Sequence, residues 1–250
     1  MLFFDLRRVM RLSQNVIVKP TLSQPVFPLN LRGLKAVFPG FALGDFAVLK
    51  GSVLSLASLL CVKSQLPTQL GGLQSNVIFI DGGNTFRLYQ IAQFVQIHRL
   101  NPKQVLDNIF ISRAFTAYQL ALLNTHQLKE VIKKYDAKLA IISDIAGFFL
   151  DKDNPEYEAQ RIFNQVTMYL SNFAREKKVI IIATYPLHIE TERNNSLQTQ
   201  TCTKTNVVLS IRKTSYARQI TLEKHPCLTS SIAELPDESS TLAVFLEMAA

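Results

Sequence analysis

The chain has 250 residues, 48% of them hydrophobic and 18% charged, with a formal net charge of +8. This length suits one α/β domain, and the apolar content excludes a disordered chain. The longest apolar stretch, 46–62, is interrupted by Lys50 and is shorter than the roughly 20 residues that a membrane span needs. Three cysteines without Cys-x-x-Cys spacing indicate neither a disulfide framework nor a zinc site. We therefore expect a cytoplasmic protein without a metal site and without a membrane partner.

The positive charge is concentrated in the body of the chain. Residues 225–250 carry four acidic residues and no Lys or Arg, which leaves +12 for residues 1–224. Such a basic domain favours a polyanionic partner, in particular nucleic acid, or an acidic protein. A solvated basic face without a ligand is the alternative interpretation. Residues 228–250 are interpreted as an acidic C-terminal tail.

The first 40 residues contain four prolines, which exclude a long helix and indicate an N-terminal arm. From residue 46 onward, strand and helix patterns alternate. Strands are expected over 46–49, 76–81, 109–113, 139–144 and 179–184, and helices over 55–65, 88–98, 117–135 and 156–176. Continuous apolar runs such as 139–142 are typical of strands covered on both faces. The pattern predicts an α/β core over 41–227, with a mainly parallel sheet flanked by helices.

The pattern changes after residue 194. Segments 206–212 and 218–224 alternate apolar and polar residues around a polar turn, which predicts an antiparallel hairpin at the C-terminal side of the sheet. The polar segment 191–205 is predicted to be a loop.

Two motifs carry a family resemblance. Residues 81–87 read Asp-Gly-Gly-Asn-Thr-Phe-Arg, and Arg113-Ala-Phe follows after Pro102. Here the sequence resembles the RecA/RadA family of recombinases, in particular the archaeal RadA paralogs, whose segments read D-x-E-N-T-F-R and R-A-F. The resemblance covers roughly 40–227 and implies a RecA-like core of the P-loop NTPase type. Asp144, at the end of an apolar strand, matches the family's Walker B carboxylate; capping of the following turn is its alternative role.

The resemblance fails where nucleotide chemistry is expected. A P-loop, G-x-x-x-x-G-K-[ST], supplies glycines for close backbone approach, a lysine for the phosphates and a hydroxyl for magnesium. Aligned through 65–67, the corresponding segment 47–54 has Val53 at the lysine position and Leu54 at the hydroxyl position. This Walker A motif is therefore degenerate. The vestigial candidates for nucleotide binding are Lys50, Gly51, Ser52 and Asp144. Ser52 and Ser55 are predicted to cap the following helix.

The catalytic parts are also replaced. The resemblance places the family's general base at Gly83, and residues 183–186 contain no amide side chain to sense the nucleotide. We therefore expect a pseudo-ATPase with no catalytic residues and with neither ATP nor magnesium as cofactor. His188, Glu190 and Glu192 alternate in a way that could hold a metal, but a solvated loop edge is the preferred interpretation.

Basic residues near the predicted loop and hairpin are candidates for DNA binding. Cations there could contact phosphates while one tyrosine stacks on a base. These candidates are Arg193, Lys204, Arg212, Lys213, Tyr216 and Arg218. The basic N-terminal arm is an equally good surface.

The resemblance implies an inactive RadA-like paralog that acts as an accessory or mediator protein in homologous recombination and DNA repair. Its expected partners are single- or double-stranded DNA, a RadA-type recombinase or another paralog. One alternative is an interaction subunit without DNA affinity, whose segment 26–29 docks on a neighbour or forms a homodimer. A divergent ATP-binding recombinase paralog is the other.

Overall fold

The computed structural model describes residues 25–31, 34–213 and 217–236. Tyr216, most of the predicted N-terminal arm and most of the acidic tail lie outside these ranges. No helix within them is long and apolar enough to cross a membrane.

The described strands form a mixed eight-stranded sheet in the order β10-β9-β8-β3-β7-β6-β4-β5, plus a small sheet of β1 and β2. Strands from β8 to β5 in this order are parallel, whereas β9 and β10 are antiparallel to their neighbours. The bounds are β1 Val26–Phe27, β2 Phe41–Ala42, β3 Phe46–Gly51, β4 Val77–Asp81, β5 Ile109–Arg113, β6 Leu139–Ser143, β7 Ile180–Tyr185, β8 Val207–Lys213, β9 Ala217–Lys224 and β10 Ser231–Pro236.

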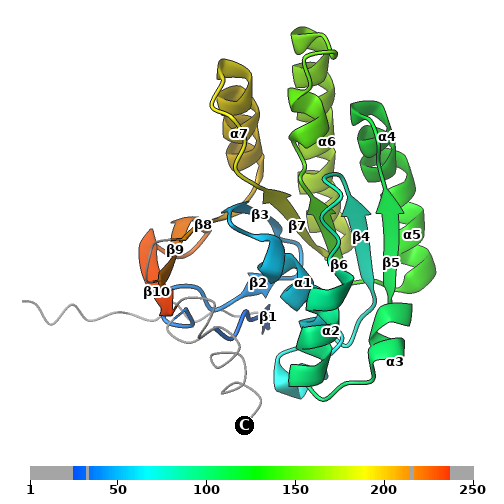
Figure 1. The fold of residues 1–250 in the computed structure, drawn as a ribbon, viewed down its shortest axis with the longest axis vertical. Coiled ribbons are helices and arrows are strands. Elements are labelled where there is room, and N and C mark those ends of the chain that lie inside the picture. Colours follow the sequence, from blue (N-terminus) through cyan, green and yellow to red (C-terminus); the bar gives the residue numbers. More distant parts are fainter. Residues whose placement is uncertain (1–24, 32–33, 214–216, 237–250) are drawn as a thin grey trace, which may run out of the picture.

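Helices cover both faces of the sheet, with α1, α2 and α3 on one side and α4 to α7 on the other (Figure 1). Their bounds are α1 Leu54–Lys63, α2 Leu88–Ile97, α3 Pro102–Asp107, α4 Ala117–Leu122, α5 Leu128–Tyr135, α6 Glu156–Lys177 and α7 Glu192–Lys204. A π-helical segment, Leu123–Gln127, joins α4 to α5.

The alternation of side chains along each strand divides the core into two parts. In β3, Ala47 and Leu49 pack in the cluster that contains α1, whereas Phe46 and Val48 pack in the cluster that contains α6 and α7. Fully buried runs, such as β6 and the first five residues of β7, account for the continuous apolar sequence of these strands. The predicted parallel sheet, its flanking helices and the antiparallel hairpin are confirmed.

The predicted loop over 191–205 is wrong, because these residues form α7. Thr191 caps the helix by accepting a hydrogen bond from the Asn194 amide, and Leu197 is buried in the core. Four threonines between 199 and 205 return their hydroxyls to carbonyls four residues earlier. The short helix α3 and the edge strand β10 were also not predicted from the sequence.

Segment 26–29 packs on the chain's own core. Val26 and Phe27 pair with Ala42 and Phe41, and Phe27 and Leu29 are each 1% exposed. The side chains of Phe27 and Leu29 are thus buried within the chain, whereas Val26 and Pro28 are half-buried. Docking of this segment on a neighbouring molecule, or homodimer formation through it, stays a prediction.

Candidate functional site

In a parallel α/β sheet, ligands bind beyond the carboxyl ends of the strands, so the β3–α1 connection is the first place to consider. β3 ends at Gly51 and α1 begins at Leu54, which leaves only Ser52 and Val53 between them. The Ser52 amide donates to the Ile211 carbonyl on β8 at 3.1 Å. Gly51 has a φ of 89°, and a Cβ there would lie 2.2 Å from the same carbonyl oxygen. The connection is therefore short and held against β8.

Lys50 leaves β3 on the face opposite α1. It has the same parity as Phe46 and Val48, which pack toward α6 and α7. Its Nζ lies 2.7 Å from Glu223 Oε2 on β9. The lysine therefore forms an ion pair with β9, which is separated from β3 by β8, and points away from the start of α1.

The first turn of α1 contacts the hairpin. Val53 is the N-cap residue of α1, is fully buried, and provides no side-chain cap. Arg218 on β9 is only 9% exposed and donates from Nη1 to Ser55 Oγ at 3.0 Å. The predicted capping of α1 by Ser52 and Ser55 is therefore wrong.

Asp81, at the end of β4, lies at the centre of a buried hydrogen-bond network. Its carboxylate accepts from the Thr85 amide at 2.8 Å, from Ser143 Oγ at 2.8 Å and from Arg113 Nη2 at 3.1 Å. Sheet register places Arg113 and Ser143 directly beside it on β5 and β6. The network joins the two motifs of the resemblance, because it links the start of 81–87 to the arginine of Arg113-Ala-Phe. Sequence reasoning did not list these residues as a site, although the paired motifs were a signal for it.

Gly83, at the position of the family's general base, packs against Asp144. A Cβ on Gly83 would lie 2.7 Å from Asp144 Cβ, so no side chain fits there without a shift. Gly147 is equally close, since its Cβ would lie 2.4 Å from Asp144 Oδ2. Two glycines therefore leave room for one aspartate side chain.

Asp144 is engaged by groups of the protein itself. Its Oδ1 lies 2.8 Å from His188 Nε2 and accepts from the Gly147 amide at 3.0 Å. Its own amide donates to Thr184 Oγ1 at the end of β7. The described residues contain no cluster of three or more His, Cys, Asp or Glu side chains that could hold a metal. His188 contacts Asp144, so it does more than lie at a solvated loop edge.

Tyr185, the last residue of β7, packs against His188. Tyr185 is 1% exposed, lies edge-on to the His188 ring at 5.7 Å, and donates its hydroxyl to Asn194 Oδ1 at 2.6 Å. Burial, reinforced by the negative charge of Asp144, raises the pKa of Tyr185. The phenol therefore serves as a hydrogen-bond donor that fixes the start of α7.

The predicted DNA-binding residues do not form one cluster. Arg193 lies at the first turn of α7 and donates to the Asn154 carbonyl, whereas Lys204 ends the same helix, about 16 Å away. Arg212 and Lys213 are exposed at the carboxyl end of β8. Arg218 is buried against α1. Of these five described residues, only Lys204 lies at the amino end of the sheet.

The family model of Rad51 matches residues 33–231. The chain belongs to the Rad51 family. Its similarity to the RecA-type recombinases and its RecA-like fold are thereby confirmed. The chain is also 32% identical over 133 residues to the meiotic recombination protein DMC1 of Saccharomyces cerevisiae. That alignment covers 52% of this chain and 39% of the relative, so the chain spans about two fifths of the length of DMC1. The particular resemblance to the archaeal RadA paralogs stays a prediction.

Proposed function

We propose that this Rad51-family protein acts in homologous recombination and DNA repair as an accessory protein that does not hydrolyse ATP. The observation that carries the proposal is the two-residue connection between β3 and α1. A P-loop needs a longer glycine-containing loop whose amides surround the phosphates. Here the Ser52 amide is bonded to Ile211, and Val53 is buried where a phosphate-binding lysine is expected.

The residues present do not fit magnesium-ATP. Lys50 is paired with Glu223 on the face of the sheet opposite α1. The Asp144 carboxylate is held by His188 and by the Gly147 amide. A general base at position 83 would collide with Asp144. Phosphate binding, metal binding and activation of water are therefore all impaired. Restoring one of these three functions would still leave the other two missing.

Calorimetry with magnesium-ATP, combined with a phosphate-release assay in the presence and absence of DNA, tests the inactive state. We expect neither heat of binding nor hydrolysis above that of buffer. Hydrolysis that disappears in the Asp144→Asn variant would overturn the proposal, because it would show that the carboxylate serves a working site.

The role of partner-binding protein is supported by the charge of the body and by the family. The body carries +12, and the chain resembles a protein whose name assigns it to meiotic recombination. We propose that the protein binds DNA, a recombinase of its own family, or both. DNA retardation in gels at low salt, repeated from 50 to 300 mM salt, tests the first; the affinity should fall steeply as salt rises. Co-sedimentation with a Rad51-type filament tests the second. The absence of both interactions would refute the accessory role.

One observation favours a second candidate, a divergent nucleotide-binding protein. Arg218 brings a guanidinium to within 3.0 Å of Ser55 in the first turn of α1, and helix N-termini attract anions. If a phosphate binds here, Arg218→Met should abolish the heat of ATP binding, whereas Arg212→Met should not. The accessory proposal expects no ATP heat from the unmodified protein.

A further inference from the structure

The amino end of the sheet, opposite the site just described, carries a dense group of cations. They come from α5, from the C-terminal ends of α6 and α7, from the residue before β6 and from the end of β9. They are Lys129, Lys133, Lys134, Lys138, Arg175, Lys177, Lys178, Lys204 and Lys224. The acidic residues of the same segments are Glu130, Asp136, Glu176 and Glu223, of which Glu223 is paired with Lys50. Asp45 is buried beneath them. We call these nine cations the amino-end surface.

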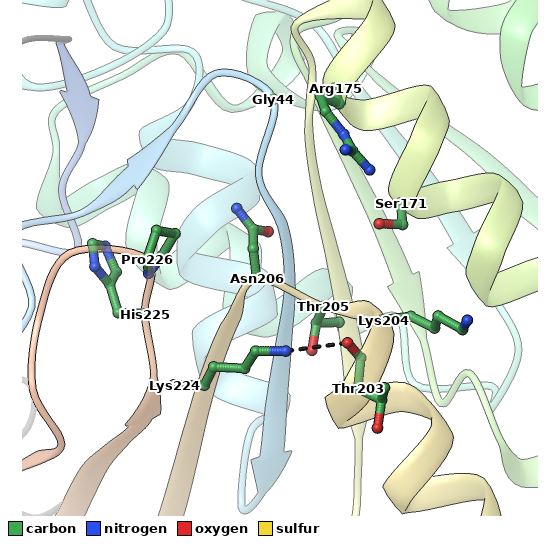
Figure 2. A pocket seen from close by; sticks show the side chains of 10 residues that line it. All are labelled: Gly44, Ser171, Arg175, Thr203, Lys204, Thr205, Asn206, Lys224, His225 and Pro226. Atoms are coloured by element: carbon green, nitrogen blue, oxygen red, sulfur yellow. Dashed lines mark hydrogen bonds between the residues drawn. The ribbon is translucent and has the colours of Figure 1, made fainter.

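Two hollows shape this surface. One, of about 580 Å³, lies between α5 and α6, and five lysines and Asp136 line it together with the apolar side chains of Ile132 and Phe173. The other, of about 510 Å³, is lined by Arg175, Lys204 and Lys224, as Figure 2 shows.

The two hollows adjoin each other. Leu43 lines the first and Gly44 the second, so a single turn separates them. A Cβ on Gly44 would lie 3.7 Å from Arg175 Cα and 3.8 Å from Lys178 Cδ, which places both cations beside this turn. Strands β6, β7, β3 and β8 begin beneath the surface, so it spans about 15 Å across the sheet. This width accommodates more than one phosphate of a nucleic-acid strand.

Helix dipoles do not account for so much charge. Cations favour helix C-termini, but three such termini supply only about −1.5 elementary charges in total. Three of the nine donate hydrogen bonds to neutral groups nearby: Lys224 to the carbonyls of Cys202 and Thr203, Lys138 to that of Leu73, and Arg175 to Asn172 Oδ1. Lys134 lies over the Tyr135 ring. None of these partners carries a negative charge. The ion pairs found within the described ranges, Lys50–Glu223, Arg113–Asp81 and His188–Asp144, use none of the nine. A net positive charge is therefore left to face solvent.

We propose that the amino-end surface binds the phosphodiester backbone of nucleic acid, with the strand crossing the turn at residues 43–44 from one hollow to the other. This inference rests on the DNA-binding part of the proposed function and assigns that binding to a surface. The exposed aromatic side chains of the described chain, Tyr89, Phe115, Tyr118 and Tyr157, follow the carboxyl ends of strands, where none can stack on a base held at the amino end. Binding through lysine and phosphate alone is independent of base sequence and favours duplex DNA at least as much as single strands.

The test compares two charge-matched triple variants of the full chain. The amino-end variant carries Lys133→Gln, Lys177→Gln and Lys178→Gln. The carboxyl-end variant carries Lys152→Gln, Arg161→Gln and Arg87→Gln, all exposed residues at the other end of the sheet. Affinity for a fluorescein-labelled 30-base-pair duplex and for a single strand of the same length is measured by anisotropy from 50 to 300 mM salt.

We expect the amino-end variant to lose roughly 100-fold in affinity at 0.1 M salt, with a salt slope flatter by about three units, because three phosphate contacts are removed. The carboxyl-end variant should bind like the unmodified protein. Loss of affinity in the carboxyl-end variant, with the amino-end variant unaffected, would overturn this inference and leave DNA binding intact. Equal losses in both variants would also overturn it, since the effect would then follow net charge. If the unmodified protein fails to bind DNA, the DNA-binding part of the proposed function fails as well.

Discussion

The two ends of the sheet treat charge in opposite ways. At the carboxyl ends of the strands, Asp81 and Lys50 each have a partner of opposite charge within the protein, and Asp144 Oδ1 lies 2.8 Å from His188 Nε2. At the amino ends, six of the nine cations lie in the last turn or at the C-cap of a helix, and the ion pairs among the described residues use none of the nine.

This difference distinguishes charged side chains that stabilise the fold from charged side chains that are available to a partner. Charges buried at the carboxyl end stabilise the protein only while their partners stay in place. Charges exposed at the amino end contribute little to stability, so their number calls for another explanation. Substitutions at the carboxyl end should therefore change the free energy of unfolding, and those at the amino end should change binding.

The largest effect is expected from Asp81→Ala. Removal of this fully buried carboxylate leaves Ser143 Oγ and the Thr85 amide without an acceptor and Arg113 without its counter-ion. We expect the free energy of unfolding in urea to fall by about 3–4 kcal/mol. The control Asp107→Ala, at an exposed position on α3, should change it by less than about 0.5 kcal/mol. A loss below about 1 kcal/mol at Asp81 would show that the network does not hold the carboxyl end.

One amine near the amino end is buried and should behave unlike its exposed neighbours. Lys63 ends α1, is 1% exposed and donates to the Leu29 carbonyl at 3.1 Å. Burial lowers its pKa to about 8. The unfolded chain keeps an ordinary pKa near 10.4, so between these values it binds more protons than the folded protein does, and stability rises with pH.

The rise should amount to about 3 kcal/mol in total, beginning above pH 8. It should disappear in Lys63→Met, as measured by the difference in urea unfolding between variant and unmodified protein from pH 7 to pH 10.5. The exposed control Lys133→Met should retain it. A pH profile of Lys63→Met that parallels that of the unmodified protein would contradict the assignment.

Gly83→Ala tests the close packing at the carboxyl end with a smaller change. The added Cβ would lie 2.7 Å from Asp144 Cβ, so one of the two segments must shift. We expect a loss of about 1–2 kcal/mol, seen as a fall in melting temperature of about 2–8 °C. Arg87→Ala, exposed in the same connection, is the control. An unchanged melting temperature for Gly83→Ala would mean that the segment has room for a side chain.

The smallest effect is expected from Glu223→Gln, which removes the partner of Lys50. Both side chains are partly exposed, so the ion pair should contribute less than about 1 kcal/mol. The difference in melting temperature between variant and unmodified protein should shrink as salt is raised from 20 to 500 mM. Glu190→Gln, exposed before α7, controls for the loss of one charge. A difference that does not respond to salt would argue against an electrostatic origin.

Most of the architecture could be predicted from the sequence because buried strands leave continuous apolar runs such as 139–142. Besides the short elements α3 and β10, the main exception is α7, whose 13 residues include one fully buried apolar residue, Leu197, and three threonines. Its helical form depends on Thr191 and on hydroxyl bonds to earlier carbonyls. Composition alone does not distinguish such a helix from a polar loop.

The candidate site was predictable only in part. The replacements expected at positions 53, 54 and 83 were predicted from the sequence. The partner of Lys50 comes from β9, across an intervening strand, and Arg218 on β9 reaches Ser55 on α1, which the sequence does not indicate. Basic residues were grouped by their closeness in sequence, whereas α7 carries Arg193 and Lys204 to opposite ends of the sheet. The amino-end surface could not be foreseen, because it assembles from three separate helix ends.

The short β3–α1 connection has a consequence for the accessory role proposed above. A ligand shifts a conformational equilibrium only as far as it binds one state better than another. With the Ser52 amide bonded to Ile211 at the middle of the sheet, hydrogen exchange there should be slow and should not respond to added nucleotide. The time that such a protein stays bound to its partner would then depend on ionic strength and concentration. ATP hydrolysis would not trigger its dissociation.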